Sequence, residues 1–235
     1  KEPPATLSLA ALPPSFRGFA KQINENIDEN GDSESGSLEM DNRTMSGIPI
    51  PFADPCVGGG LFVERILRIH SERISGNTPN ERREDTLRLL EGLQLVDSSE
   101  VAVTSARKRI VIVLARLNLV DLDGDGDEGK IGLSEAEMII ESNVRCVDPL
   151  LGEWPWNEGP MLLVSRPPWL RIKDRFRGHP DGSALRKRLS CQLREFKESD
   201  GRTRFSAIKG NVNLYRLYIE RSMQLCQKGG RARLV

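Results

Sequence analysis

The sequence has few of the residues that most often carry catalysis. Only two histidines occur, His70 and His179, and neither lies beside a serine or cysteine motif typical of a nucleophile. The four cysteines are far apart and form no C-x-x-C pair, which predicts buried free thiols and neither a zinc site nor a thioredoxin-type redox centre. No catalytic residue is therefore identified, and enzymatic activity is not expected unless distant residues assemble a site in the fold.

Long apolar runs and an excess of one charge are also lacking. The longest apolar stretch, near residues 110–120, is about a dozen residues long, which is too short to cross a bilayer, so no transmembrane segment is expected. Basic and acidic residues number 34 each, yet residues 166–235 contain 18 basic and only 6 acidic residues. An acidic region is thus joined to a basic one, and this asymmetry indicates either intramolecular docking of the two regions or a charged partner.

Helical periodicity dominates the pattern that remains. The β-branched run Ile110–Val113 is compatible with a helix or a buried strand, and we expect a helix. An S-x-x-E pattern at Ser134 and Glu137 predicts a capping box at the start of a helix. Helices are expected at 61–72, 80–95, 99–120, 134–144, 183–199 and 204–227. The expected class is mainly α, with an acidic region at 1–148, followed at 149–235 by a Trp/Pro-rich connector and a basic helical region.

Two acidic segments share one register along the chain. Residues 121–135 read DLDGDGDEGKIGLSE, and residues 28–42 read DENGDSESGSLEMDN. In both, acidic or amide side chains alternate at the start, and a glycine and a hydrophobic residue follow at the same spacing. Carboxylates this close repel one another unless a cation lies among them. Alternating oxygen ligands in a tight loop suit Ca²⁺, so the sequence predicts an internal repeat of two calcium loops.

The two segments resemble the loops of the EF-hand superfamily, in which an acidic loop joins two helices. The second loop matches at its alternating aspartates, at Gly126 and at Ile131, but it spans fifteen residues, whereas the standard loop has twelve. The resemblance implies a bidentate closing carboxylate, for which Glu135 and Glu137 both remain candidates. The predicted calcium ligands are Asp121, Asp123, Asp125, Asp127 and Glu135 in the second loop and Asp28, Asn30, Asp32, Glu34 and Asn42 in the first.

EF-hands usually pair, so the resemblance also implies partner segments without ligands. Residues 70–84 could pair with the first loop, and residues 95–107 could pair with the second. The first loop should bind more weakly, because it ends in Asn42 and its exit helix is interrupted by Gly47 and Pro49.

Three other features have both a functional and a structural interpretation. The glycine run at 57–62 lacks either phosphate-binding fingerprint and has no clear strand before it, which favours a hinge before a helix. The tryptophan-rich segment could dock a partner or cover the core. The same alternatives apply to the apolar stripe of the helix at 183–199, which comprises Leu185, Leu189, Leu193 and Phe196.

The sequence therefore predicts a calcium-binding regulatory or structural protein that contacts a protein partner through its basic helical extension. The alternative is a non-enzymatic scaffold subunit of a large assembly, whose acidic loops hold no ion or a purely structural one. Nucleic acid is not expected as a partner, because the basic residues are spread over amphipathic helices and form no recognisable nucleic-acid-binding motif.

Overall fold

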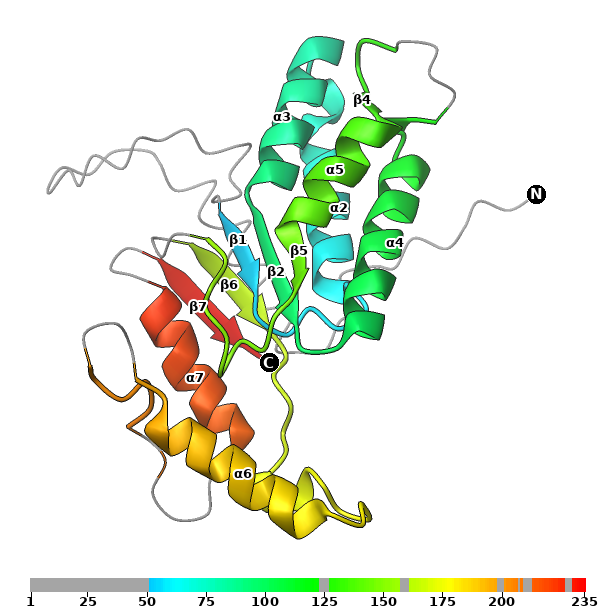
Figure 1. Cartoon of the computed structure of the whole chain (residues 1–235). Helices are drawn as coiled ribbons and strands as arrows, with labels where there is room; N and C mark the ends of the chain where they lie inside the picture. The colour runs from blue at the N-terminus through cyan, green and yellow to red at the C-terminus, as the bar shows by residue number, and fades with distance from the viewer. Residues whose placement is uncertain are drawn as a thin grey trace, which may run out of the picture. The chain divides into compact units, whose positions relative to one another are not determined.

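The computed structural model describes residues 51–122, 127–156, 161–197, 201–206, 208, 213–226 and 230–235. Its central element is a parallel sheet of five strands in the order β5-β2-β1-β6-β7 (Figure 1). The strands are β1 (Phe52–Asp54), β2 (Leu93–Asp97), β5 (Val144–Cys146), β6 (Leu162–Ser165) and β7 (Arg231–Leu234). The α-helices are α2 (Leu61–Arg73), α3 (Pro79–Glu91), α4 (Glu100–Arg116), α5 (Leu133–Asn143), α6 (Gly182–Glu195) and α7 (Leu214–Leu225).

The expectation of a mainly α protein is wrong, because the parallel sheet makes this an α/β fold. Its central strands β1, β2 and β6 are short and buried on both faces, so they read as brief apolar runs without alternation. Such runs cannot be told from buried helix by periodicity alone. β2 lies in the segment expected to end a helix at residue 95, and β6 lies in the expected irregular connector. The sheet combines strands from the expected acidic region (β1, β2 and β5) with strands from the expected basic region (β6 and β7), which begins at residue 149.

Two crossovers of two helices each cover one face of the sheet. Helices α2 and α3 connect β1 to β2, and helices α4 and α5 connect β2 to β5. Helix α2 packs on α4 and α3 packs on α5, while α4 and α5 contact the strands. The chain then returns from β5 to the other side of β1, where β6 lies, and α6 and α7 lead to β7 on the opposite face (Figure 1). The strand order therefore reverses between β1 and β6.

Side-chain caps explain where α3 and α4 begin. The Thr78 side chain accepts from the Glu81 amide and Pro79 is the first residue of α3, whereas Ser99 caps α4. The run Ile110–Val113 is helical, as expected, within α4. The capping box expected at Ser134 is not formed, because α5 already begins at Leu133 after Gly132. Helix α7 starts ten residues later than the expected residue 204.

A cluster of buried residues joins α6, α7 and the loop after β5. Leu189 is 7% exposed and Leu193 is fully buried, and both pack with Leu217 and Tyr218 of α7. The apolar stripe of α6 is therefore core at Leu189 and Leu193, which confirms the structural interpretation there and leaves no free docking face at those positions. No helix in the described part of the chain is long and apolar enough to span a membrane.

Candidate functional site

The point where the strand order reverses brings together the last residues of β1 and β6. Ligands of open parallel sheets bind outside the carboxyl ends of the strands at such a topological switch point. Here Asp54 ends β1 and Ser165 ends β6, and the turn after β1 leads directly into α2. We call this group the carboxyl-edge site, which comprises Asp54, Gly58, Gly60, Asp97 and Ser165.

Asp54 is a buried carboxyl group with one oxygen bonded and one free. Its side-chain Oδ1 accepts a 2.6 Å hydrogen bond from the Ser165 hydroxyl and a 2.9 Å bond from the Cys56 amide. Its Oδ2 is buried and has no hydrogen-bond partner among the described residues. Burial raises the pKa of Asp54 to about 7, against the effect of the two hydrogen bonds. An unpaired acceptor at this depth is costly, and a donor on a ligand would satisfy it.

The turn between β1 and α2 is built on two glycines in the left-handed region. Gly58 has φ +52° and Gly60 has φ +81°, and a Cβ at Gly60 would lie 3.3 Å from the Cα of Ala106 in α4. Helix α2 then begins at Leu61 with no side-chain cap on its N-terminus. Glycines in this turn let a ligand approach the backbone closely, as they do in dinucleotide-binding folds.

Asp97, the last residue of β2, holds this turn in place. Its Oδ2 accepts a 3.0 Å hydrogen bond from the Gly58 amide, and its Oδ1 accepts one of the same length from the Ser99 amide. Doubly wound folds place an acidic residue after the second strand, where it binds the ribose hydroxyls of a nucleotide. The side chain of Asp97 remains partly exposed and can take this role.

The carboxyl-edge site contains acidic side chains that have no basic partner among the described residues. Asp54, Asp97 and Asp148, which follows β5, form no ion pair with any basic side chain in the described ranges. Arg109, which packs near Gly60, is bonded instead to Glu64 at 2.6 Å. Such an arrangement disfavours a pyrophosphate and favours a ligand with positive charge.

Helix α7 closes the site from the opposite face of the sheet. Cys56 packs against the buried cluster that contains Tyr218, and burial raises the pKa of both groups. Cys56 is therefore a protonated thiol that packs against the core of α6 and α7, and not a nucleophile.

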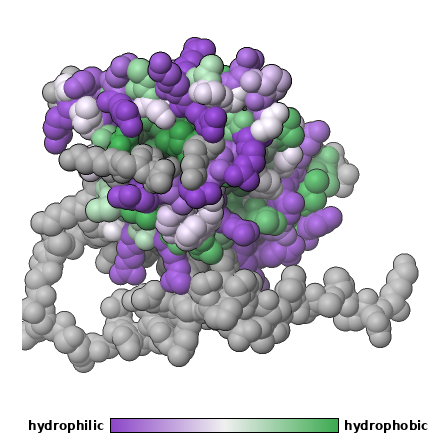
Figure 2. Space-filling model, turned by 90° about the horizontal axis from the view of Figure 1, so that it is seen from below, coloured by the Kyte–Doolittle hydropathy of each residue, from purple (hydrophilic) through white to green (hydrophobic). Residues whose placement is uncertain are grey.

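The rim beside Ser165 presents an exposed aromatic ring and a basic surface. Trp169 is 68% exposed and stacks on Tyr215 of α7 with their ring centres 4.2 Å apart. Lys187, Arg188 and Arg194 are exposed along α6. Figure 2, which views the molecule from below, shows that hydrophilic residues cover much of this face, with hydrophobic residues between them.

The predicted calcium ligands fall partly outside the described residues. Asp123 and Asp125 lie outside them, and so do all the ligands of the first loop, namely Asp28, Asn30, Asp32, Glu34 and Asn42. Asp121 ends the short strand β3 (Val120–Asp121), which pairs in parallel with β4 (Ile131–Gly132). No group of three metal-binding side chains occurs in the part of the chain that is described.

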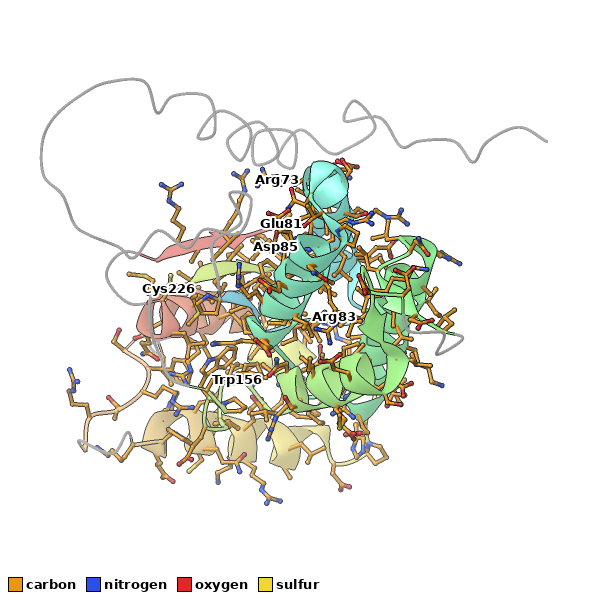
Figure 3. The ribbon with its side chains drawn as sticks, turned by 90° about the horizontal axis from the view of Figure 1, so that it is seen from above. Arg73, Glu81, Arg83, Asp85, Trp156 and Cys226 are labelled. Atoms are coloured by element: carbon orange, nitrogen blue, oxygen red, sulfur yellow. The ribbon has the colours of Figure 1, made fainter. Side chains whose placement is uncertain are left out.

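The described ligands of the second loop contact protein groups. Asp127 accepts a 3.0 Å hydrogen bond from the Gly129 amide and forms an ion pair with Lys130 at 3.1 Å. Glu135 is bonded to Arg83 of α3 at 2.8 Å (Figure 3, where Arg83 is labelled between α3 and α5). Glu135 must therefore leave Arg83, or share it, in order to bind a cation.

The segments expected to act as partner hands lie within regular elements of the fold. Residues 70–84 form the end of α2, the 3-10 helix Ile74–Gly76 and the start of α3. Residues 95–107 contain the end of β2 and the first half of α4, and β2 pairs with β1 and β5.

Sequence reasoning missed Asp54, Asp97 and Ser165. The glycine run was set aside because no strand was expected before it, whereas β1 ends four residues before Gly58. The signal that could have found the site is a recurring one, a short apolar run that ends in a polar residue at a turn: FAD, LQLVD and LLVS. No family model matches this chain, and no curated protein is significantly similar to it.

Proposed function

We propose that the protein binds a positively charged nucleoside cofactor at the carboxyl-edge site and acts as a group-transfer enzyme. S-adenosylmethionine has this chemistry, because it combines a ribose and a sulfonium and carries no phosphate. The observation that carries the proposal is the buried Oδ2 of Asp54, which has no partner among the described residues and lies at the topological switch point.

The ribose part of the proposal rests on the turn and on Asp97. Gly58 and Gly60 give the turn the left-handed backbone typical of such loops, and Asp97 offers a carboxylate to a ribose diol from the end of the adjacent strand. The cation part rests on charge. A phosphate would approach two carboxylates with no described basic side chain bonded to either, whereas a sulfonium or ammonium group would be attracted to them.

Such a cofactor, when bound, supplies an electrophilic methyl group, so the reaction class is methyl transfer. The residues of the chain would bind and orient it: Asp97 at the ribose, and Asp54, held by Ser165, at the cationic group. Ser165 ends β6, and Trp169 follows it by four residues on the exposed rim. An acceptor would therefore enter along this rim.

The rim favours nucleic acid as the acceptor, contrary to the expectation from sequence. The exposed Trp169 ring, backed by Tyr215, is the kind of surface on which a nucleobase stacks. The basic residues of α6 are suited to phosphates, and α6 packs in one cluster with Leu150 and Cys56, beside the site. The proposed function is therefore methylation of a nucleic acid base.

Calorimetric titration tests the cofactor. The wild-type protein should bind S-adenosylmethionine and S-adenosylhomocysteine and should not bind ATP or NAD. Asp97→Asn should weaken binding about tenfold or more, because a charge-assisted hydrogen bond becomes a neutral one. Asp85→Asn, in α3, is the matched control. Binding of ATP without S-adenosylmethionine would refute the charge argument, and no binding of any nucleoside would refute the whole proposal.

We also propose that residues 121–135 bind calcium between α4 and α5. Support comes from the helix-loop-helix arrangement and from the β3–β4 pair, in which Val120 lies opposite Ile131 and holds both ends of the loop together. Asp121 and Glu135 lie at these two ends. Asp97 precedes α4, and this loop follows the other end of the helix. The ion would therefore have a structural or regulatory role and no part in chemistry at the carboxyl-edge site.

A further inference from the structure

We propose that Glu64 and Arg109 form a positioning pair that fixes the glycine turn relative to Asp97 and so sets cofactor affinity. The inference rests on the proposed function, because it concerns the same site. Neither residue would touch the cofactor. Both act through the two helices that begin at the carboxyl edge.

The pair joins α2 to α4 with well-formed hydrogen bonds. Arg109 Nη1 donates to Glu64 Oε2 at 2.6 Å, while Arg68 donates to Glu64 Oε1 from Nη2 at 2.9 Å and from Nε at 3.2 Å. Both carboxylate oxygens are thus engaged by guanidinium groups, and the Glu64 side chain is only 19% exposed. A carboxylate bonded on both oxygens has little freedom to change rotamer.

The pair lies directly behind the glycine turn. The Glu64 amide donates to the Gly60 carbonyl at 3.0 Å, so Glu64 belongs to the first turn of α2. The Cδ of Arg109 would be 3.4 Å from a Cβ at Gly60, and Ala106 lies one helical turn earlier on the same face of α4. The side chain of Arg109 therefore packs against the residue at which the turn becomes helix.

Asp97 is linked to the same helix from its other side. Ser99 caps α4, and Asp97 accepts from the amides of both Ser99 and Gly58. The carboxylate and the turn are thus each attached to α4, one through its N-terminus and one through Arg109. Sites for small ligands depend on positions held to about half an ångström, so a change in the approach of α2 to α4 should weaken binding.

A second ion pair provides a matched control. Arg83 of α3 bonds to Glu135 of α5 at 2.8 Å, and it likewise joins two helices on the same face of the sheet. The two arginines are equally exposed, at 38% and 39%. Ion pairs of exposed arginines contribute little to stability, so each loss should cost a small amount, slightly more for the pair of Glu64, which is 19% exposed against 39% for Glu135.

The experiment compares Arg109→Met with Arg83→Met by calorimetric titration of S-adenosylhomocysteine in the presence of a calcium chelator. We expect about tenfold weaker binding for Arg109→Met and no change for Arg83→Met, with similar melting temperatures. Glu64→Gln should weaken binding too, and the double variant should be no worse than Arg109→Met alone. Equal affinities for the two Met variants would overturn the inference. If Arg109→Met does not fold, Arg109→Gln, which removes the charge, takes its place.

Amide hydrogen exchange separates this inference from the proposed function. Without ligand, the Gly58 amide should exchange faster in Arg109→Met than in the wild type and in Arg83→Met. If the wild type binds no nucleoside, the proposed function fails, and faster exchange at Gly58 would still support the positioning of the turn. Unchanged exchange at Gly58 together with unchanged affinity would refute the proposed positioning role of the pair.

Discussion

The hydroxyl of Ser165 donates a 2.6 Å hydrogen bond to Oδ1 of Asp54, and this bond joins the carboxyl ends of β6 and β1. The two residues are 111 positions apart in the chain, and both are buried. The bond fixes one oxygen of Asp54 and leaves Oδ2 for a ligand. It lies at the place where a doubly wound sheet binds its ligand.

Asp54→Asn should stabilise the protein at alkaline pH. The pKa of Asp54 is about 7 in the folded protein, against an ordinary value of 3.8, so the folded state holds its proton more tightly and loses stability as pH rises from about 4 through 7. At pH 8 the variant should be more stable by up to ~4 kcal/mol, and at pH 4 it should match the wild type. Chemical denaturation at both pH values measures this difference. An equal effect at both would show that Asp54 does not titrate near neutrality.

Affinity for S-adenosylmethionine should rise with pH between 6 and 8. Ionisation of Asp54 creates the negative charge that attracts the cation, so binding should strengthen as pH passes about 7. Asp54→Asn should bind weakly with no such dependence. Titrations at three pH values would measure the change, and a flat wild-type profile would exclude Asp54 as the counter-charge.

His70 should make the protein sensitive to acid. The Thr86 hydroxyl donates its proton to the Arg82 carbonyl, so it accepts a 3.2 Å hydrogen bond from Nε2 of His70. Burial lowers the pKa of His70 to about 4. Because the unfolded state binds the proton first, stability is lost as pH falls from 6.5 through 4, by about 2 kcal/mol at pH 5. His70→Gln retains a donor and should lose this slope. His179→Gln, at an exposed site, should keep it.

Calcium binding should depend on the Arg83–Glu135 bond. Glu135→Gln should remove the tighter phase of a calcium titration, and Arg83→Gln should strengthen that phase by freeing the carboxylate. The loop at 28–42 should give the weaker phase, and Asn42→Glu should improve it. If Glu137→Gln removes the tight phase instead, Glu137 is the closing ligand.

Leu193→Ala should destabilise the fold by 2–5 kcal/mol, because Leu193 is fully buried between α6 and α7. Arg194→Ala, one residue later on the exposed side of the helix, should change stability by less than about 0.5 kcal/mol. Urea denaturation of both variants measures the contrast. A small effect of Leu193→Ala would mean that α6 is not part of the core.

The helices of the acidic region were largely predictable from sequence, whereas the sheet was not. The 3.6-residue periodicity locates α2, α4 and α5 to within a few residues. The central strands β1, β2 and β6 are three to five residues long and buried on both faces, so local pattern could not separate LQLVD from the end of a helix. The candidate site was therefore missed with them.

The sequence by itself determined the separation of charge, the helical periodicity and the two acidic segments, because these are properties of neighbouring residues. Tertiary structure decided the parallel order of the strands, since pairing in parallel needs partners far along the chain. Only that order brings Asp54, Asp97 and Ser165 to one edge and removes Asp54 from water. Their chemistry follows from the burial and proximity that the sheet imposes on three ordinary polar residues.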